Sequence, residues 1–157
     1  MNVEIRKATL KDLSIIQDLN LMLFKKEYKE YDKSLNLNWT KGKEGTIYFK
    51  KRITDKDSCA LVAVVEGKIV GYRVGAILKP EAYRILPNYA EAENMFVLPE
   101  YRSKGIGTKL LKEFLKWCKA KGSKRVKLVV DSRNKKALDF DRRIGFKDYS
   151  IILEKEI

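Results

Sequence analysis

The spacing of apolar residues in the first third of the chain changes from the period of a strand to that of a helix. Residues 3–7 alternate apolar and charged side chains, which predicts a half-buried strand. Thr9 begins the sequence TLKD, which is close to a capping box. The apolar residues within 10–28 then recur at helical spacing. They predict a first helix. The polar and aromatic residues 30–57 are interpreted as a loop and a second helix.

The middle of the chain predicts three strands. Residues 58–65 (SCALVAVV) form a continuous apolar run, and the sequence EGK that follows is typical of a tight turn. Residues 69–78 are then the antiparallel mate of this first strand. A loop with two prolines over residues 79–88 separates the hairpin from a further strand over residues 89–98.

An amphipathic helix is predicted over residues 105–121. Leu110, Phe114 and Cys118 lie on its apolar face, and Gly122 stands where a C-terminal glycine ends a helix. The helix therefore packs one face on the sheet.

The last part of the chain predicts a buried strand over residues 126–130, a short helix over 134–143 and a final strand over 149–153. The element order is β-α-α-β-β-β-α-β-α-β, without internal repeats or linkers. This order predicts one domain over residues 1–157, of the α/β class, with a mixed sheet covered by helices.

Composition excludes several classes of protein. Of the 157 residues, 45% are hydrophobic and 35% are charged, which excludes wholesale disorder and a membrane protein. No signal peptide is visible, and no apolar stretch approaches the roughly 18 residues of a membrane span. There is no histidine, and Cys59 and Cys118 lack CxxC spacing, so neither a metal site nor a disulfide is expected. A cytoplasmic location fits these features, and the abundant lysine and isoleucine with a single glutamine are typical of thermophilic proteins.

The formal net charge is +13. A strongly basic chain invites a nucleic-acid partner. The favoured interpretation is a highly charged soluble surface, because the basic residues are spread along the chain and not gathered into one arm.

The most informative segment is residues 97–108, VLPEYRSKGIGT, where a strand ends, a turn with two glycines follows and a helix begins. The first N–H groups of a helix have no intrahelical partners, and with the helix dipole they form a site for phosphate. Arg102 and Lys104 add positive charge. The P-loop and dinucleotide-binding sequences are both absent. The alternative interpretation is a tight chain reversal with no ligand.

Two sequence motifs occur together. The spacing Arg102-x-x-Gly105-x-Gly107 after a V-x-P-E-Y strand end resembles the acetyl-CoA-binding signature of the GNAT family of acetyltransferases. Asn134-x-x-Ala137-x-x-Phe140, followed by IGF at residues 144–146, resembles the second signature of that family. The resemblance covers nearly the whole chain and implies a mixed, mostly antiparallel sheet with helices on both faces.

The resemblance also implies a set of contacts to acetyl-CoA. The backbone of residues 103–108 would hold the pyrophosphate, residues 95–97 would splay from the neighbouring strand and pair with the pantetheine arm, and Asn134 would lie near that arm. The implied cofactor-binding residues are Met95, Phe96, Val97, Arg102, Ser103, Lys104, Gly105, Ile106, Gly107, Thr108 and Asn134.

Acetyl transfer to an amine needs a base, because an alkylammonium is protonated at neutral pH. Without histidine, a carboxylate is the natural base, and strand alternation puts Glu91 and Glu93 on one face. By resemblance to the family, Glu91 stands where the histone-lysine branch has its glutamate base, and Glu93 stands where the spermidine/spermine branch has its own. Glu93 is slightly preferred as the base. The alternative is that both are solvated surface residues.

Asp141 stands where many members of the family have a tyrosine that protonates the departing thiolate. Three interpretations are open. Asp141 takes a different role, such as binding a cationic substrate; the acid lies elsewhere, with Tyr149 and Tyr101 as candidates; or no acid is needed, because a thiolate leaves readily. A retired enzyme is a further alternative. A plain charge pair is equally favoured, with Arg142, Arg143 or Lys147 as the partner.

The sequence thus predicts an N-acetyltransferase that moves an acetyl group from acetyl-CoA to a primary amine by direct attack in a ternary complex. The acceptor is a small amine or a protein amino group, although the net charge weighs against a polycation. The alternatives are a non-catalytic acyl-CoA-binding module that docks on nucleic acid or the ribosome, and an enzyme for RNA-bound amines. Homodimers are common in this family, so a homodimer is one expected assembly.

Overall fold

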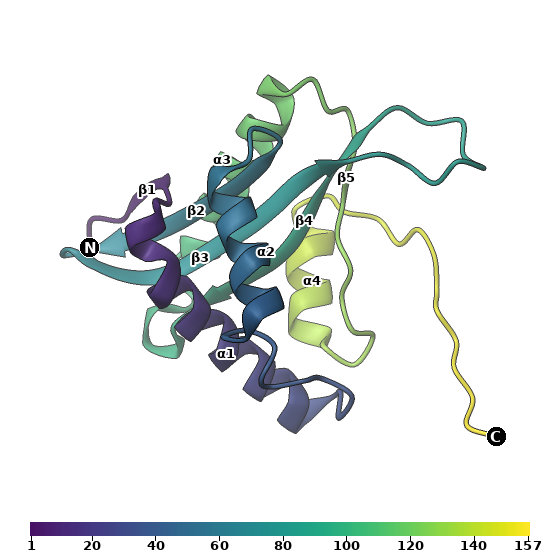
Figure 1. The fold of residues 1–157 in the computed structure, drawn as a ribbon, viewed down its shortest axis with the longest axis horizontal. Coiled ribbons are helices and arrows are strands. Elements are labelled where there is room, and N and C mark those ends of the chain that lie inside the picture. Colours follow the sequence, from purple (N-terminus) through teal and green to yellow (C-terminus); the bar gives the residue numbers. More distant parts are fainter.

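Five strands form one sheet in the order in which they occur along the chain (Figure 1). The computed structural model describes residues 1–157. Neighbouring strands are antiparallel except for the last pair, which is parallel, so the predicted mixed, mostly antiparallel sheet is confirmed. The strands are β1 (Glu4–Lys7), β2 (Ser58–Val65), β3 (Lys68–Leu78), β4 (Tyr89–Val97) and β5 (Val126–Lys127).

Helices cover both faces of this sheet, as predicted. One face packs against α3 and is built around Phe114 and Leu110, which are fully buried. The other packs against α1 and α2 and is built around Ile16, Phe49 and Tyr72. The α-helices are α1 (Leu13–Glu30), α2 (Lys43–Thr54), α3 (Ile106–Ala120) and α4 (Lys135–Arg143), and the two 3-10 turns are η1 (Leu10–Asp12) and η2 (Pro99–Tyr101). No helix combines the length and apolar character needed to cross a membrane.

The local signals in the sequence mark the ends of the elements well. The turn between β2 and β3 places Glu66 and Gly67 at φ values of 48° and 76°, as a two-residue hairpin turn requires. Gly122 follows α3 at φ 76°, in the left-handed conformation expected of a C-terminal glycine. The first predicted helix starts with η1, where the Thr9 N–H donates to the Asp12 carboxylate at 2.8 Å.

Two strand predictions near the C-terminus are wrong. The predicted buried strand over residues 126–130 is only Val126–Lys127, and neither residue is buried. Residues 149–153 form no strand, and Ile151, Ile152 and Leu153 are exposed in a segment that runs away from the sheet (Figure 1). A strand needs a ladder partner, and with β5 this short the apolar run 149–153 has none.

A β-bulge interrupts β4 at Glu93. Val74 pairs with Asn94 and Gly75 pairs with Ala92, so Glu93 is the extra residue without a partner on β3. Before the bulge the side chain of Ala92 packs in the α3-side core, and after it that of Met95 does. The bulge therefore brings Glu93 and Asn94 together toward α1 and α2.

Candidate active site

The edge of β4 that faces β5 is mostly unpaired. β5 pairs with β4 only at Ala90 and Glu91, so no strand pairs with this edge from Ala92 to Val97. Such an edge offers a row of backbone N–H and C=O groups to another extended chain. Phe96 and Val97 are nearly buried, so these two residues offer backbone rather than side-chain contacts. Because β5 ends at Lys127, it does not pair with residues 95–97, and a contact of these residues with a pantetheine arm stays a prediction.

The glycine turn leads from this edge to the N-terminus of α3. Ser103 and Gly105 have φ values of 58° and 77°, and no side chain caps the first turn of α3. Ile106 is 1% exposed and fixes this end of the helix in the core. The free N–H groups of the first turn, including those of Gly107 and Thr108, are therefore available to an anion.

Gly107 lies within van der Waals range of side chains from β4 and α4. A Cβ atom at this position would lie 3.4 Å from the Met95 methyl carbon and 3.6 Å from the Phe140 ring. The turn, the open edge of β4 and α4 thus meet at one point of the molecule.

The basic side chains of the turn form hydrogen bonds with backbone carbonyl groups of the protein itself. Arg102 Nε donates to the Val97 carbonyl at 2.8 Å, and its guanidinium lies 4.9 Å from the centre of the Phe96 ring. Lys104 Nζ donates to the Glu100 carbonyl at 3.0 Å. Anion binding at this turn therefore depends first on backbone N–H groups.

Asn134 is the N-cap of α4. Its side-chain oxygen accepts a hydrogen bond from the Ala137 N–H at 3.2 Å, which satisfies one of the free donors of the helix. The capping contact fixes the start of α4, which carries Phe140 and Asp141.

Glu93 is held by two side chains of α2. Arg52 donates to both carboxylate oxygens, at 2.7 and 2.6 Å, and the Tyr48 hydroxyl donates to one of them. Burial and the carboxylate of Glu93 together raise the pKa of Tyr48 far above its usual value, so Tyr48 remains a proton donor. Neither partner was indicated by the sequence, since both lie more than 40 residues away.

The same contacts continue into the core. Asn94 donates to Tyr48 at 3.0 Å and accepts from Tyr72 at 2.6 Å, and Asn20 donates to Tyr72 at 2.8 Å. Thr40 completes the chain by donating to Asn20 at 2.7 Å. We call this set of hydrogen-bonded side chains the α1–α2 polar network: Asn20, Thr40, Tyr48, Arg52, Tyr72, Glu93 and Asn94.

Glu91 has a different environment. Its only cation partner is Lys127, at 3.7 Å on the neighbouring strand β5, and its side chain is 20% exposed. The two predicted glutamates thus differ in their cation partners. Glu93 has a close, bidentate contact with Arg52, whereas Glu91 has one long contact with Lys127.

Asp141 is 8% exposed, and burial raises the pKa of its carboxyl group. Its opposing charge is the guanidinium of Arg73 in β3, which partly offsets that rise. The expected pairing with a neighbouring basic residue is not observed, and Arg142 pairs instead with Asp148 at 2.7 Å. Arg73 was missed in the sequence, although it is the one charged residue in the run 69–78.

Tyr149 lies away from these groups. It is 64% exposed and accepts a hydrogen bond at 2.9 Å from Arg84, which lies in the connection between β3 and β4. Arg125 lies over its ring at 5.4 Å. Its observed partners are cations rather than Asp141 or the two glutamates.

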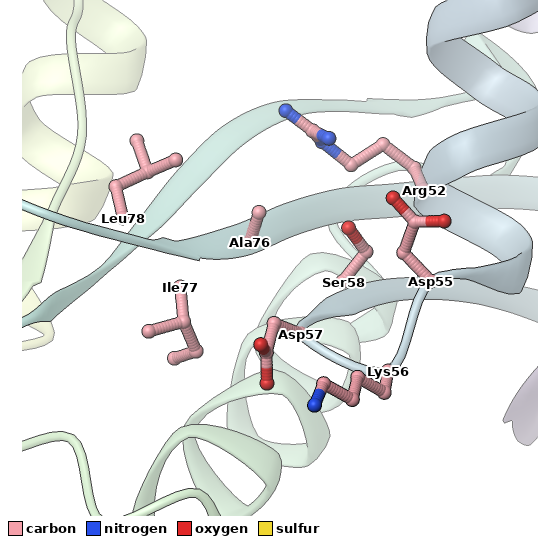
Figure 2. Close-up of a pocket in the computed structure, with 8 residues that line it drawn as sticks. All are labelled: Arg52, Asp55, Lys56, Asp57, Ser58, Ala76, Ile77 and Leu78. Carbon is pink, nitrogen blue, oxygen red and sulfur yellow. The ribbon is translucent and has the colours of Figure 1, made fainter.

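A shallow hollow of about 370 Å³ lies where α2 ends beside β2 and β3. Figure 2 shows Arg52 reaching along this hollow, with Asp55 and Ser58 beside it and Ala76 on β3. Arg52 binds Glu93, and Ala76 is the register partner of Glu91. The hollow is therefore lined by one residue that binds Glu93 and by one that pairs with Glu91 across the sheet.

A family model described as "Acetyltransferase (GNAT) family" matches residues 19–146, a span that contains the open edge, the glycine turn and α4. The chain belongs to the GNAT family of acetyltransferases. The resemblance seen in the two sequence signatures is thereby confirmed.

Relatives and solved structures agree with this assignment. An uncharacterized N-acetyltransferase of Methanocaldococcus jannaschii is 32% identical over 94% of this chain, which spans 62% of that protein's length. A spermidine N(1)-acetyltransferase of Thermoplasma acidophilum is 27% identical over 94% of this chain and 89% of its own. The structure of a predicted acetyltransferase with acetyl-CoA from Clostridium acetobutylicum has the same fold, with a TM-score of 0.77, 20% identity and coverage of 99% and 96% of the two chains.

Proposed function

We propose that this GNAT protein transfers an acetyl group from acetyl-CoA to a primary amine. The observation that carries the proposal is the uncapped N-terminus of α3 placed beside the open edge of β4. The first matches the phosphates of CoA in charge, and the second matches the amides of its pantetheine arm.

The residues present fit the donor. Backbone N–H groups of residues 103–108 would bind the pyrophosphate, and the open edge at residues 95–97 would pair with the pantetheine arm. A Cβ atom at Gly107 would make ordinary van der Waals contacts with Met95 and Phe140, so packing does not require this glycine, and its lack of a side chain leaves the helix N-terminus open. Acetyl-CoA supplies an activated acetyl group, and the chain's own task is to bind it, orient the amine and remove a proton.

Glu91 is the better candidate for the base. Both oxygens of Glu93 accept hydrogen bonds from Arg52, and one of them also accepts from Tyr48, so side chains of α2 already occupy this carboxylate. Glu91 has one long contact to Lys127 and a partly exposed side chain, so it can accept the proton of an ammonium group directly or through water. This reverses the slight preference for Glu93 that its local sequence suggested, and makes Glu93 a positioning residue.

We place the acceptor in the hollow beside Arg52 and Ala76. Its size suits a small amine, and Asp55 on its wall can attract an ammonium group. A relative named as a spermidine acetyltransferase supports an amine acceptor of this kind. The net charge of +13 favours a singly charged amine over a polycation. The buried free thiols Cys59 and Cys118 support the cytoplasm as the compartment.

Calorimetric titration with acetyl-CoA tests the donor site. Gly105→Glu places a negative side chain at the uncapped helix end, and affinity should fall at least about 100-fold. Gly122→Glu is the matched control, because Gly122 also has a φ of about 76° and open space around it but lies at the other end of α3. Equal losses in both variants, or no binding by the unmodified protein, would contradict the proposed donor site.

Release of CoA in the presence of primary amines then separates an enzyme from a binding module. Tight binding of acetyl-CoA without amine-dependent release would identify the chain as a non-catalytic acyl-CoA-binding protein.

A further inference from the structure

Arg73 is an unusual residue for the interior of a protein. It is 4% exposed, and its Nε is the one buried side-chain nitrogen or oxygen without a hydrogen-bond partner. Burial lowers the pKa of Arg73 to about 10, so the guanidinium is still charged at neutral pH. Burying a charge without full compensation is costly, so the position calls for an explanation.

The surroundings place Arg73 beneath the proposed donor site. Its Nη2 atom lies 3.4 Å from the sulfur of Met95, the residue opposite it on β4. The Met95 side chain in turn lies against Gly107 at the start of α3 and close to Phe140 on α4. Arg73 therefore lies under the point where the open edge of β4, the glycine turn and α4 meet.

Asp141 is the single acidic side chain that faces Arg73, and it compensates the guanidinium only in part. It lies near enough to interact through charge, but the two residues form neither a hydrogen bond nor an ion pair. The other groups around the guanidinium are neutral at pH 7: the buried thiols and phenol of Cys59, Cys118 and Tyr72, and the ring of Phe114 at 5.7 Å. Positive charge therefore remains available for a further negative group.

We propose that Arg73 supplies the positive charge that stabilises the CoA thiolate released during acetyl transfer. This rests on the proposed function. In the reaction the amine nitrogen bonds to the acetyl carbon and the C–S bond breaks. The bonding electron pair stays on sulfur. Glu91 first passes the proton of the ammonium group to water, and it then accepts the second proton, which the neutral amine loses on attack.

Arg73 offsets the repulsion that the Asp141 carboxylate would exert on a thiolate. A carboxylate beside a developing thiolate repels it, and Asp141 occupies the position where a tyrosine would donate a proton. A buried guanidinium on the other side of Met95 offsets this repulsion, because charges interact strongly where water is excluded. The two residues should thus shift the pKa of a bound thiol in opposite directions.

The test is a pH titration of CoA bound to the protein, followed by the ultraviolet absorbance of the thiolate. Desulfo-CoA provides the reference, so that the protein's own tyrosines and cysteines cancel. The unmodified protein should lower the pKa of the bound thiol by about one unit or more from that of free CoA. Arg73→Met should abolish the shift, Arg73→Lys should retain most of it, and Asp141→Asn should enlarge it. Arg84→Met, on a half-buried arginine in the connection between β3 and β4, is the control and should change nothing.

The outcomes separate this proposal from the proposed function. An unshifted thiol in the unmodified protein, or an equal shift in Arg73→Met, overturns the role of Arg73 while leaving CoA binding intact. Failure of the unmodified protein to bind CoA in calorimetry overturns both. If Arg73→Met does not fold, Arg73→Gln provides a second uncharged side chain at this position and should also abolish the shift. A shift in Arg73→Gln equal to that of the unmodified protein, or an unchanged shift in Asp141→Asn, contradicts the proposal.

Discussion

The two sides of the sheet hold polar groups in contrasting ways. On the α1–α2 side, the α1–α2 polar network links seven side chains without a break from Thr40 to Arg52. On the α3–α4 side, Arg73 has an unpartnered Nε and Asp141 has no hydrogen bond or ion pair with it. Both sets are largely buried, so exposure does not explain the difference.

The contrast distinguishes structural polar groups from groups that await a ligand. Buried polar groups that satisfy one another rigidify the fold and define a single arrangement of the core. A buried group left incomplete raises the energy of the free protein and is relieved when a ligand supplies the missing partner. The α1–α2 polar network thus positions β4 and Glu93, while Arg73 and Asp141 lie ready for a charged group in the donor site.

The largest effect is expected for the glutamate outside the network. Glu91→Gln should lower kcat about 100-fold, the size typical of losing a general base. Glu93→Gln should lower it about tenfold, because Arg52 loses its partner and β4 shifts, while the base remains. Steady-state kinetics with acetyl-CoA and a primary amine measure both, and the KM for acetyl-CoA should not change. A larger loss in Glu93→Gln than in Glu91→Gln would restore Glu93 as the base.

The sequence indicates the parts of this comparison that depend on local spacing. The hairpin of residues 58–78, the helix α3 and the glycine turn are encoded in consecutive residues, and each is found where the pattern places it. The strand predicted over 149–153 has the right composition for a strand, but composition carries no information about a partner. Its failure reflects the short β5.

Local sequence patterns do not indicate contacts between residues that are far apart in the chain. The partners of Glu93 in α2 are 41 and 45 residues away in the sequence, and no local pattern in either segment indicates that the two are in contact. The bulge that turns Glu93 and Asn94 the same way also breaks the alternation on which the sequence argument relied. The Arg73–Asp141 relation joins β3 to α4, so only the folded chain reveals it.

The next effect concerns stability on the network side. Tyr72→Phe keeps the ring but removes the hydroxyl that bonds Asn20 and Asn94, which leaves these two amides joined only by their own longer contact of 3.4 Å. The free energy of unfolding should fall by about 2 kcal/mol. Urea denaturation measures this loss, and Tyr83→Phe, which removes an exposed hydroxyl, is the matched control. A loss no larger than that of the control would mean that the network adds little to stability.

The smallest effect concerns the opposite side of the sheet. Because burial raises the pKa of Asp141, the unfolded chain releases this proton at a lower pH than the folded protein does. Ionised Asp141 therefore costs stability, and the cost appears as the pH rises from the ordinary aspartate value through the raised one. The stability of the unmodified protein should therefore fall, relative to Asp141→Asn, as the pH rises above about 4, the ordinary pKa of an aspartate. Urea titrations across this range measure the difference, and Asp139→Asn on the exposed face of α4 controls for the loss of one negative charge. A relative change of the opposite sign would show that Arg73 holds Asp141 ionised in a stabilising pair, and the α3–α4 side would then be as complete as the network.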